Sequence, residues 1–557
     1  MRLFRCVFLF FLCANVTAQQ VLTLDGAKRA IPNYLLGFNG RSTEGPSWGD
    51  EGFLKLVQQM SPNIVRYPAG TQANYWDWRT GTFIAGCGKT SPYTFSIPLF
   101  VKGLPSSASV VYVVNMARPT PVTGLAWDDP NTSLAVLEKK IDDMLAALRE
   151  FERVGNFPIA IELGNEFYFA NEHAGIYAAN PTLYLQHAAV ICQRVKAVFP
   201  DLGIILCTTK YGTSGRESWN EAVINALKND GVLKNSVKGI VQHHYINDKY
   251  GDQTVVTNSA SCMRAIAEGL EYTLDCQRDY DLIPDGLELW LTEYGVTKMN
   301  ATSTWTAGLR SVSMTMGWLS KGPKITNLLY HHITDDPDVI DKTNMKAGPI
   351  GLGFGLLCAA GKGMTHLQPV AISNNPATAL NQKALNGFLF SNAEYAVLFL
   401  ANFSDQRFPA VDVSRLVNPS GSCDITQHWS ERPYELNASD QKGINSSQFS
   451  TENRMVDLPP FSVTTIRVKR DLSNSVDHLG ANTLSVYPSP FSSGFTLEVD
   501  GAWLGARLTI FDLTGQCVFE SQVRQAKNLI QFPFPKGIYM LVLNIDGKQQ
   551  CLKITKK

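Results

Sequence analysis

The sequence carries no excess of charge of either sign, because its 49 lysine and arginine residues equal its 49 aspartate and glutamate residues. A balanced chain sets up no global field that would draw nucleic acid or an anionic membrane surface to it. We therefore expect no nucleic-acid partner. Any affinity for an acidic substrate has to come from a local cluster of basic side chains.

Long apolar runs are also missing. The run over residues 6–13 is too short to cross a bilayer, which takes about 20 residues, and no later segment qualifies. It follows the basic start Met1–Arg5 and precedes Val16-Thr17-Ala18, which is the order of regions in a secretory signal peptide. We predict that residues 1–18 are a signal peptide, that the mature chain begins at Gln19 or Gln20, and that no segment spans a membrane.

Motifs for metals and cofactors are absent as well. The sequence has no HExxH or CxxC spacing, and His243 and His244, as neighbours on a strand, cannot both point the same way. No glycine-rich phosphate turn follows an early strand, which argues against a doubly wound dinucleotide-binding fold. We expect no metal site and no cofactor.

Cysteine is scattered rather than clustered. Nine of the 11 cysteines follow the predicted signal peptide, which holds Cys6 and Cys13, and an odd number spread through a large chain does not form a disulfide framework. Cys207 and Cys358 lie in apolar runs and are expected to be buried thiols. Cys262 and Cys276 lie in one connection, where a disulfide and two free thiols are both open.

The sequence does contain a repeated alternation of short apolar runs with helical segments. Parallel strands buried on both faces read as such runs, and eight of them predict an α/β chain with a (β/α)8 TIM barrel over residues 19–364. Residues 20–33 alternate weakly and either precede the barrel or join a later β-domain. The predicted barrel strands are residues 35–40, 63–70, 110–115, 159–166, 203–208, 239–245, 287–293 and 325–332.

Beyond the barrel the pattern changes to short alternating strands. Residues 365–470 are predicted to form an accessory antiparallel β-sandwich, as in Tyr395–Phe403 and Phe461–Val468. A polar linker over residues 471–482 follows, and residues 483–557 are predicted to be a second, small C-terminal β-sandwich.

Two glutamates end predicted strands on opposite sides of the barrel mouth. Glu166 follows the fourth strand directly after Asn165, and Glu293 ends the seventh strand before Tyr294-Gly295. Hydrolysis of a glycosidic bond needs a proton donor and a group that stabilises an oxocarbenium-like centre, and two carboxyl groups provide both. A single glutamate after a strand is usually a solvated surface residue. Two glutamates at corresponding ends of barrel strands favour a catalytic role for the pair.

This pair resembles the signature of the clan A retaining glycoside hydrolases. The resemblance implies that Glu166 is the acid/base, Glu293 the nucleophile, and Asn165 a partner of the sugar 2-OH. It also implies that Arg66, at the end of the second strand, bonds the nucleophile and keeps it ionised. Tyr245, after His244 on the sixth strand, falls where the clan often has an aromatic or histidine group beside the nucleophile.

The other candidates for substrate binding lie at strand ends or in the loops that follow. Trp76, between Tyr75 and Trp78, either belongs to a sugar-stacking platform or packs in the loop core. His331 and His332 are open between substrate contact and packing, and His243 reads more readily as a core histidine. The candidates are Arg66, His244, Tyr245, Asn39, Asn115, Trp76, Tyr294 and His332.

Two further resemblances within the clan disagree about the sugar. Val241–Tyr245 resembles the His-His-Tyr strand of the heparanase and β-glucuronidase group, whereas Arg66–Gly70 resembles a segment of the α-L-arabinofuranosidases, with Tyr67 for Trp and Ala69 for Gly. We lean toward a β-linked uronide-type glycan, with a neutral sugar as the alternative and a non-catalytic glycan-binding protein as a third hypothesis. A uronate would need a cation, for which the candidates are Arg79, Arg118, Lys210 and Lys249.

The last 75 or so residues resemble the C-terminal sorting domain of the bacterial type IX secretion system, which is found in Bacteroidetes. The landmarks occur in family order: Val486–Phe491, Leu508–Gly515, Gly537–Val542 and a basic end over Lys553–Lys557. The resemblance implies that the secretion machinery is a partner. It also implies release or cell-surface attachment after transit through the periplasm.

Overall fold

The computed structural model describes residues 19–557 except 42, 44, 130–132, 213–214, 251–254, 296–303, 334–338, 418–420, 436–442, 471–484, 488–490, 500–502 and 546–547. The predicted signal peptide and linker lie outside the described residues. The chain falls into two compact units, residues 1–470 and 471–557. Among the described helices, none is long and apolar enough to cross a bilayer.

The first unit contains a closed barrel of eight parallel strands, which confirms the predicted fold class. Each strand is buried on both faces, which explains why the sequence shows continuous apolar runs there. In barrel order the strands are β3 (Leu36–Asn39), β4 (Ile64–Tyr67), β7 (Ser109–Val114), β8 (Ala160–Leu163), β9 (Gly203–Cys207), β10 (Gly239–Tyr245), β11 (Glu288–Gly295) and β12 (Ile325–Tyr330).

Helices alternate with these strands, and side-chain caps define several of their starts. Asp50 caps the first helix by accepting a hydrogen bond from the backbone of Phe53, and Ser133 caps α3 by accepting one from Val136. The helices are α1 (Glu51–Met60), α2 (Ile97–Gly103), α3 (Leu134–Arg153), α4 (Pro181–Val198), α5 (Glu217–Asn229), α6 (Gly231–Ser236), α7 (Asn247–Tyr250), α8 (Ser259–Asp275), α9 (Gln277–Asp281), α10 (Trp305–Lys321) and α11 (Pro349–Gly361).

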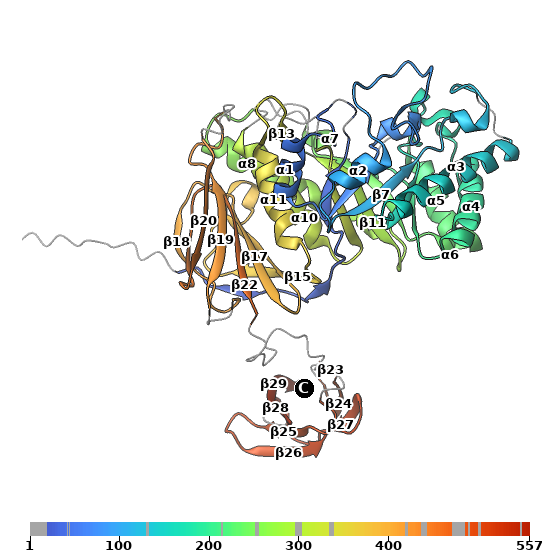
Figure 1. Cartoon of the computed structure of the whole chain (residues 1–557). Helices are drawn as coiled ribbons and strands as arrows, with labels where there is room; N and C mark the ends of the chain where they lie inside the picture. Colours follow the sequence, from blue (N-terminus) through green and yellow to red (C-terminus); the bar gives the residue numbers. More distant parts are fainter. Residues whose placement is uncertain are drawn as a thin grey trace, which may run out of the picture. The chain divides into compact units, whose positions relative to one another are not determined.

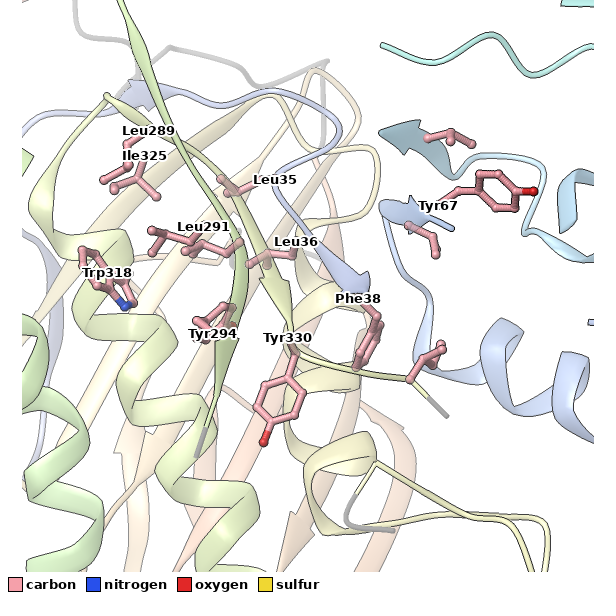
Figure 2. Close-up of a cluster of buried hydrophobic side chains, with 14 of the residues drawn as sticks. Leu35, Leu36, Phe38, Tyr67, Leu289, Leu291, Tyr294, Trp318, Ile325 and Tyr330 are labelled. Carbon is pink, nitrogen blue, oxygen red and sulfur yellow. The ribbon is translucent and has the colours of Figure 1, made fainter. Parts of the chain in front are cut away.

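Alternate residues of the barrel strands point to opposite sides of the barrel wall. An apolar plug fills the lower interior and includes Ile64, Val111, Ile205 and Trp290. The outward residues pack under the helices, and Figure 2 shows this layer with Leu291, Tyr294 and Trp318 among its buried side chains. The parity of a residue along its strand therefore decides whether it faces the interior or the helices, except in β11, where a register shift between Leu291 and Tyr294 brings both into the outward layer.

An antiparallel sheet lies beside the barrel in the same unit (Figure 1). Helix α11 packs against its strands β17 and β22, and a two-stranded sheet, β18 with β21, covers a separate apolar core on its other face. The N-terminal strand β1 pairs with β15 in this sheet, so that Leu22 lies opposite Ile372. The strands of both layers are β1 (Leu22–Leu24), β2 (Arg29–Ala30), β15 (His366–Ile372), β16 (Leu385–Ser391), β17 (Tyr395–Asn402), β18 (Phe408–Asp412), β19 (Cys423–Trp429), β20 (Asn445–Thr451), β21 (Met455–Leu458) and β22 (Ser462–Lys469).

The second unit has two antiparallel sheets of three and four strands around a core of its own, which includes Phe495, Trp503 and Phe532. The three-stranded sheet is β23 (Ser485–Tyr487), β24 (Gly494–Glu498) and β27 (Lys527–Gln531). The four-stranded sheet is β25 (Arg507–Phe511), β26 (Cys517–Gln522), β28 (Gly537–Ile545) and β29 (Lys548–Lys556).

Cys262 and Cys276 are held apart by a helix. Cys262 lies in the first turn of α8, where Thr306 donates to its sulfur at 3.0 Å, and Cys276 caps the far end. Fourteen helical steps separate them, or about 21 Å at 1.5 Å per residue. The structure therefore excludes the disulfide that the sequence left open, and both thiols are free.

Candidate functional site

The two predicted catalytic carboxylates meet at the mouth of the barrel. Glu293 lies within β11, and Glu166 follows β8 with a positive φ of 54°. A carboxylate oxygen of each glutamate and a ring nitrogen of His243 all lie within 4.8 Å of one another. Retaining glycosidases place their carboxyl groups about 5–5.5 Å apart. The distance is thus short enough for direct attack by one of them.

A buried ionic layer lies between the apolar plug and the mouth. Arg66 is fully buried and donates from Nε and Nη2 to the two oxygens of Glu162 at 2.9 and 2.7 Å. Its Nη1 donates to Oε1 of Glu293 at 2.5 Å. One guanidinium thus holds two buried carboxylates, and this fork geometry fixes its orientation.

Glu293 is surrounded by donors. Tyr245 donates its hydroxyl to Oε2 at 2.7 Å, Asn39 donates to Oε1 at 3.5 Å, and ring nitrogens of His243 and His331 each lie 3.5 Å from Oε2. Burial alone would raise the pKa of this carboxyl, but the charges of His243 and Arg66 and the Tyr245 hydrogen bond hold it well below its usual range. Glu293 is therefore ionised at neutral pH, as a nucleophile must be.

The backbone at Gly70 comes close to this carboxylate. A Cβ atom built at position 70 would overlap Oε1 of Glu293 and come within 3.4 Å of Nη1 of Arg66. The requirement for glycine here therefore includes the space that the carboxylate of Glu293 occupies.

Glu166 is oriented through one of its two oxygens. Oε1 accepts from the hydroxyl of Tyr168 at 2.8 Å and lies 2.9 Å from Nδ1 of His243. Burial favours the neutral form of His243, but the charges of Glu293 and Glu166 outweigh it and raise the pKa of the imidazole above 6.5. A protonated His243 donates from Nδ1 to Glu166 and from Nε2 to Thr292, whose Oγ1 is 3.3 Å away.

Asn165 is held in place beneath the mouth with one polar group unused. Its Oδ1 accepts from Nη2 of Arg66 at 2.7 Å, and its backbone carbonyl accepts from Asn74 at 3.0 Å. Its Nδ2 is buried and has no hydrogen-bond partner among the described residues. A buried amide donor of this kind is available to a ligand hydroxyl.

The sequence-based assignment of the two histidines on β10 was wrong. His243 faces the interior, opposite Glu293 in the register of β10 and β11. His244 points to the helices, where it is fully buried, lies 3.2 Å from the hydroxyl of Tyr272 and packs on Trp318. His243 therefore belongs to the site and His244 is the core histidine.

Three more predicted substrate contacts lie in packed regions. Tyr294 is buried under α10, where its hydroxyl is 2.7 Å from that of Thr315. Trp76 is 3% exposed and donates to the hydroxyl of Tyr67 from the short hairpin β5 (Trp76–Asp77) and β6 (Thr82–Phe83). The side chain of Asn115 is engaged by backbone groups, donating to the carbonyl of Trp76 and accepting from the amide of Arg118. These assignments are corrected.

His332 is also displaced from the predicted role. Its ring lies against that of His331, tilted by 47° with 3.5 Å between centroids, and its Nε2 lies 3.1 Å from Nη1 of Arg41. His331, and not His332, reaches Glu293 and lines the cavity. Burial and the surrounding cations lower the pKa of His331 to about 4 and that of His332 to about 2, so both rings are neutral.

A cavity of about 800 Å³ opens over the two carboxylates. Of the cations proposed from the sequence, Lys210 lines it, whereas Arg79 pairs with Asp143, Arg118 donates to the carbonyl of Glu172, and Lys249 pairs with Asp275. The lining residues are Arg41, Thr71, Glu166, Tyr168, Phe169, Thr209, Lys210, Tyr211, Gly212, Arg216, His243, Tyr245, Glu293 and His331.

Among the residues that the structure describes, two groups of side chains each offer three ligand atoms within 4.8 Å of one another. One is Glu166, His243 and Glu293, the site itself. The other is the buried set His244, Cys276 and Asp279 on the outer side of β10. Charges of Lys210 and Lys321 act on this second set, and burial raises the pKa of Cys276 to about 12 and that of Asp279 to about 7. Neighbouring ammonium groups and protonated ligand atoms disfavour the binding of a metal cation at this second set.

Sequence reasoning missed Glu162 and Gly70. Glu162 stands alone in an apolar strand, and the available signal was the need of a buried arginine for buried counter-charges. The role of Gly70 depends on close approach in space, for which the sequence carries no pattern.

Comparison with known proteins gives a family match for the C-terminal domain and a fold match for the first unit. Residues 485–557 match the family model described as the secretion system C-terminal sorting domain, which confirms the predicted export to the cell surface or beyond it. No curated protein sequence matches the chain significantly.

Solved structures share the fold of the first unit with low sequence identity. A family 51 α-L-arabinofuranosidase from Bifidobacterium longum matches with a TM-score of 0.55 and 13% identity, over 81% of this chain and 99% of that one. The family 51 enzyme from Thermotoga petrophila RKU-1 matches with 0.56 and 12% identity, over 81% and 99%. An α-L-arabinofuranosidase from Thermotoga maritima matches with 0.52 and 13% identity, over 81% and 100%. At these identities the likeness shows a common fold.

Proposed function

We propose that the chain is a secreted retaining glycoside hydrolase that cleaves an extracellular polysaccharide or its oligosaccharides by double displacement. The observation that carries the proposal is the placement of Glu166 and Glu293, with carboxylate oxygens within 4.8 Å, over a cavity at the mouth of the barrel. Glu293 is held ionised by the charges of His243 and Arg66. Glu166 is oriented by the hydroxyl of Tyr168 and by Nδ1 of His243.

In the first step Glu293 attacks the anomeric carbon while Glu166 transfers its proton to the leaving glycosidic oxygen. The glycosyl group is then attached to Oε2 or Oε1 of Glu293 through an ester bond. In the second step Glu166 removes a proton from water, which attacks the same carbon and releases Glu293. Asn165 supplies the free amide donor for the hydroxyl at carbon 2, whose bond strengthens as charge develops.

The cavity supports a uronide or another acidic glycan more than a neutral one. Lys210, Arg216 and Arg41 line it, and its described lining contains no carboxylate besides Glu166 and Glu293. Arg216 lies 3.9 Å from the ring centroid of Phe169, so a cation and an aromatic face are presented together. A substrate carboxylate that moves from water into the cavity needs such partners to offset the cost of its desolvation.

Replacement of Glu293 by alanine tests the mechanism. We expect kcat on an aryl glycoside to fall by at least about 10⁴-fold, because the covalent route is lost. Azide should restore turnover and give a glycosyl azide of inverted anomeric configuration, which nuclear magnetic resonance identifies. Wild-type activity in Glu293→Ala would overturn the proposal.

A substrate panel separates the alternatives. Aryl β-glucuronide, aryl α-L-arabinofuranoside and aryl β-glucoside distinguish an acidic from a neutral substrate. A non-catalytic glycan-binding protein would bind polysaccharides on the same panel and release no product from any of them.

A further inference from the structure

The loop after β9 supplies one side of the catalytic cavity. Its residues 209–212, called the β9 rim below, all line the cavity. In the barrel β9 lies beside β8, which delivers Glu166, and two strands away from β11, which carries Glu293. The proposed mechanism has Glu166 give its proton to the leaving oxygen. The β9 rim therefore lies on the side toward which the leaving part of a glycan departs.

The first residue of the β9 rim is fixed from α5. Asn220 accepts from the backbone amide of Thr209 at 2.9 Å and donates to the backbone carbonyl of the same residue at 2.6 Å. Both residues are buried. A paired contact of this kind sets the direction in which the rim leaves the strand, because it holds both polar groups of one peptide-forming residue.

Helix α9 holds Tyr211 of the β9 rim at two points. The buried carboxylate of Asp279 accepts from the backbone amide of Tyr211 at 2.6 Å. The guanidinium carbon of Arg278 lies 3.3 Å from the centroid of the Tyr211 ring. Tyr211 is half-buried and lines the cavity. Its backbone and one face of its ring are thus fixed by α9 before any ligand arrives.

The contact with Tyr211 connects the cavity to a buried polar set that the proposed mechanism does not use. His244, Cys276 and Asp279 bring their polar atoms together on the outer side of β10. A carboxylate in such a place needs hydrogen-bond donors to offset its burial, and the amide of Tyr211 is one of them. Asp279 therefore has a partner in the wall of the cavity, which gives this set a role other than metal binding.

We propose that Tyr211 is the sugar-stacking residue of a subsite on the leaving-group side, and that Asp279 and Arg278 are its positioning residues. The ligand is a pyranose unit, whose C–H groups pack on the ring face opposite Arg278. A ring that is already fixed loses little conformational entropy when it binds a sugar. The proposal rests on the proposed function, because the role of Glu166 as the acid defines the leaving-group side.

The first test compares a sugar with a single atom as the leaving group. The probes are hexamers of xylose, glucose, galactose and galacturonate, a chondroitin sulfate hexasaccharide, and the glycosyl fluoride that matches the hexasaccharide cleaved fastest. We expect Tyr211→Ala to lower the ratio of kcat/KM for that hexasaccharide to kcat/KM for the fluoride by at least about tenfold. Fluoride does not reach the ring, so this ratio isolates the leaving-group side.

Two further variants make the kinetic test specific. Tyr211→Phe keeps the ring and should keep the wild-type ratio. Phe449→Ala, which removes an exposed ring from β20 in the antiparallel sheet, should keep it too. A ratio that is the same in Tyr211→Ala and in the wild type would overturn the subsite.

The second test concerns the positioning residues. Asp279→Ala should lower the same ratio by about tenfold, whereas Asp279→Asn retains an oxygen for the Tyr211 amide and should restore most of it. Asp281→Ala, at the exposed end of the same helix, is the matched control. Hydrogen exchange of the full chain adds a measurement that needs no turnover. The Tyr211 amide should exchange at least about tenfold faster in Asp279→Ala than in Asp279→Asn. Equal exchange in these two variants would overturn the role of Asp279.

Binding without turnover separates this proposal from the proposed function. The full chain carrying Glu293→Gln is titrated with the five hexasaccharides by calorimetry, and the tightest should bind at least about tenfold more weakly when Tyr211→Ala is added. Binding of none of them, or binding that ignores Tyr211, rejects the subsite, and the glycosidase then stands if Glu293→Ala abolishes turnover. Binding that depends on Tyr211, without turnover of any glycan, rejects the glycosidase and keeps a sugar site at this residue.

Discussion

At the scale of single residues, Gly70 is the position where the smallest change should have the largest effect. A methyl group there would overlap Oε1 of Glu293 and push the carboxylate from its place. We expect Gly70→Ala to lower kcat by about 100-fold, since a displacement of about 1 Å at a reacting group is enough for such a loss.

The matched control for this change is Gly231→Ala. Gly231 begins α6 with open space around it, so its replacement should leave kcat unchanged and stability unchanged or slightly higher. Steady-state kinetics and thermal unfolding of both variants provide the measurement. Equal activity of Gly70→Ala and the control would show that Glu293 moves freely.

The two histidines of β10 should differ in what their loss affects. His243 is the largest charge holding down the pKa of Glu293. His243→Gln removes it, so the pKa of Glu293 rises and the acid limb of the kcat/KM profile moves to higher pH, with at least about tenfold lower activity at its optimum. An unchanged profile would show that His243 stays neutral.

His244→Gln should instead change the pH dependence of stability. Burial lowers the pKa of His244 well below 6.5, so below that pH the unfolded chain binds a proton that the folded chain does not. Wild-type stability therefore falls on acidification by about 1.4 kcal/mol per pH unit from this residue. Urea unfolding at pH 7.5 and pH 5 should show a smaller loss in the variant, with the kinetic pH profile unaltered.

The same pair shows where sequence reasoning reached its limit at this scale. The sequence placed both glutamates, Arg66 and Tyr245 at the mouth, because a strand end delivers them there whatever the loops do. Facing was harder. Tyr245 and His244 are consecutive and cannot share a face, so the prediction for Tyr245 already implied His243. Trp76 was unpredictable for another reason, since its burial depends on how Phe83 and Phe95 of the same long loop pack against it in space.

At the scale of elements, helices α8 and α10 are joined by a buried ion pair. Arg310 donates from Nη2 to Glu268 at 2.9 Å, and both side chains are less than a tenth exposed. Glu268→Leu leaves the guanidinium buried without its partner, and we expect a loss of about 3–5 kcal/mol in the free energy of unfolding.

Two further variants make this prediction specific. Glu268→Leu combined with Arg310→Met should recover most of the lost stability, because apolar groups of similar volume replace both charges. Arg153→Met, which removes an exposed partner of Glu150, should leave the denaturant midpoint unchanged. Failure of the double variant to recover would mean that the pair fixes the packing of the two helices.

The elements of the barrel were predicted from the sequence because their signal is simple. A strand buried on both faces has to be apolar throughout, and eight such runs separated by helical segments admit few other folds. The residues of the outward layer were harder to predict. In the sequence, Tyr294 and Leu291 are indistinguishable from residues of the interior until the register of the strand is known.

At the scale of the whole molecule, the sorting domain and the first unit have separate apolar cores. We expect removal of residues 480–557 to leave a folded enzyme with unchanged kcat/KM and unfolding midpoint. In cells it should accumulate in the periplasm, which fractionation and immunoblotting detect against the full-length chain. Loss of solubility or activity on truncation would show that the domain is part of the catalytic body.

The pairing of β1 with β15 gives the first unit an order of assembly. Leu22 meets Ile372 across about 350 residues of chain, so the sheet stays open until that distant stretch is available. For a chain that is threaded through a membrane from its N-terminal end, the strand that emerges first is also among the last to find its partner. The pairing of β1 with β15 therefore forms only after residues up to Ile372 have crossed the membrane. Until then the first unit cannot complete its fold, and the chain can continue to cross.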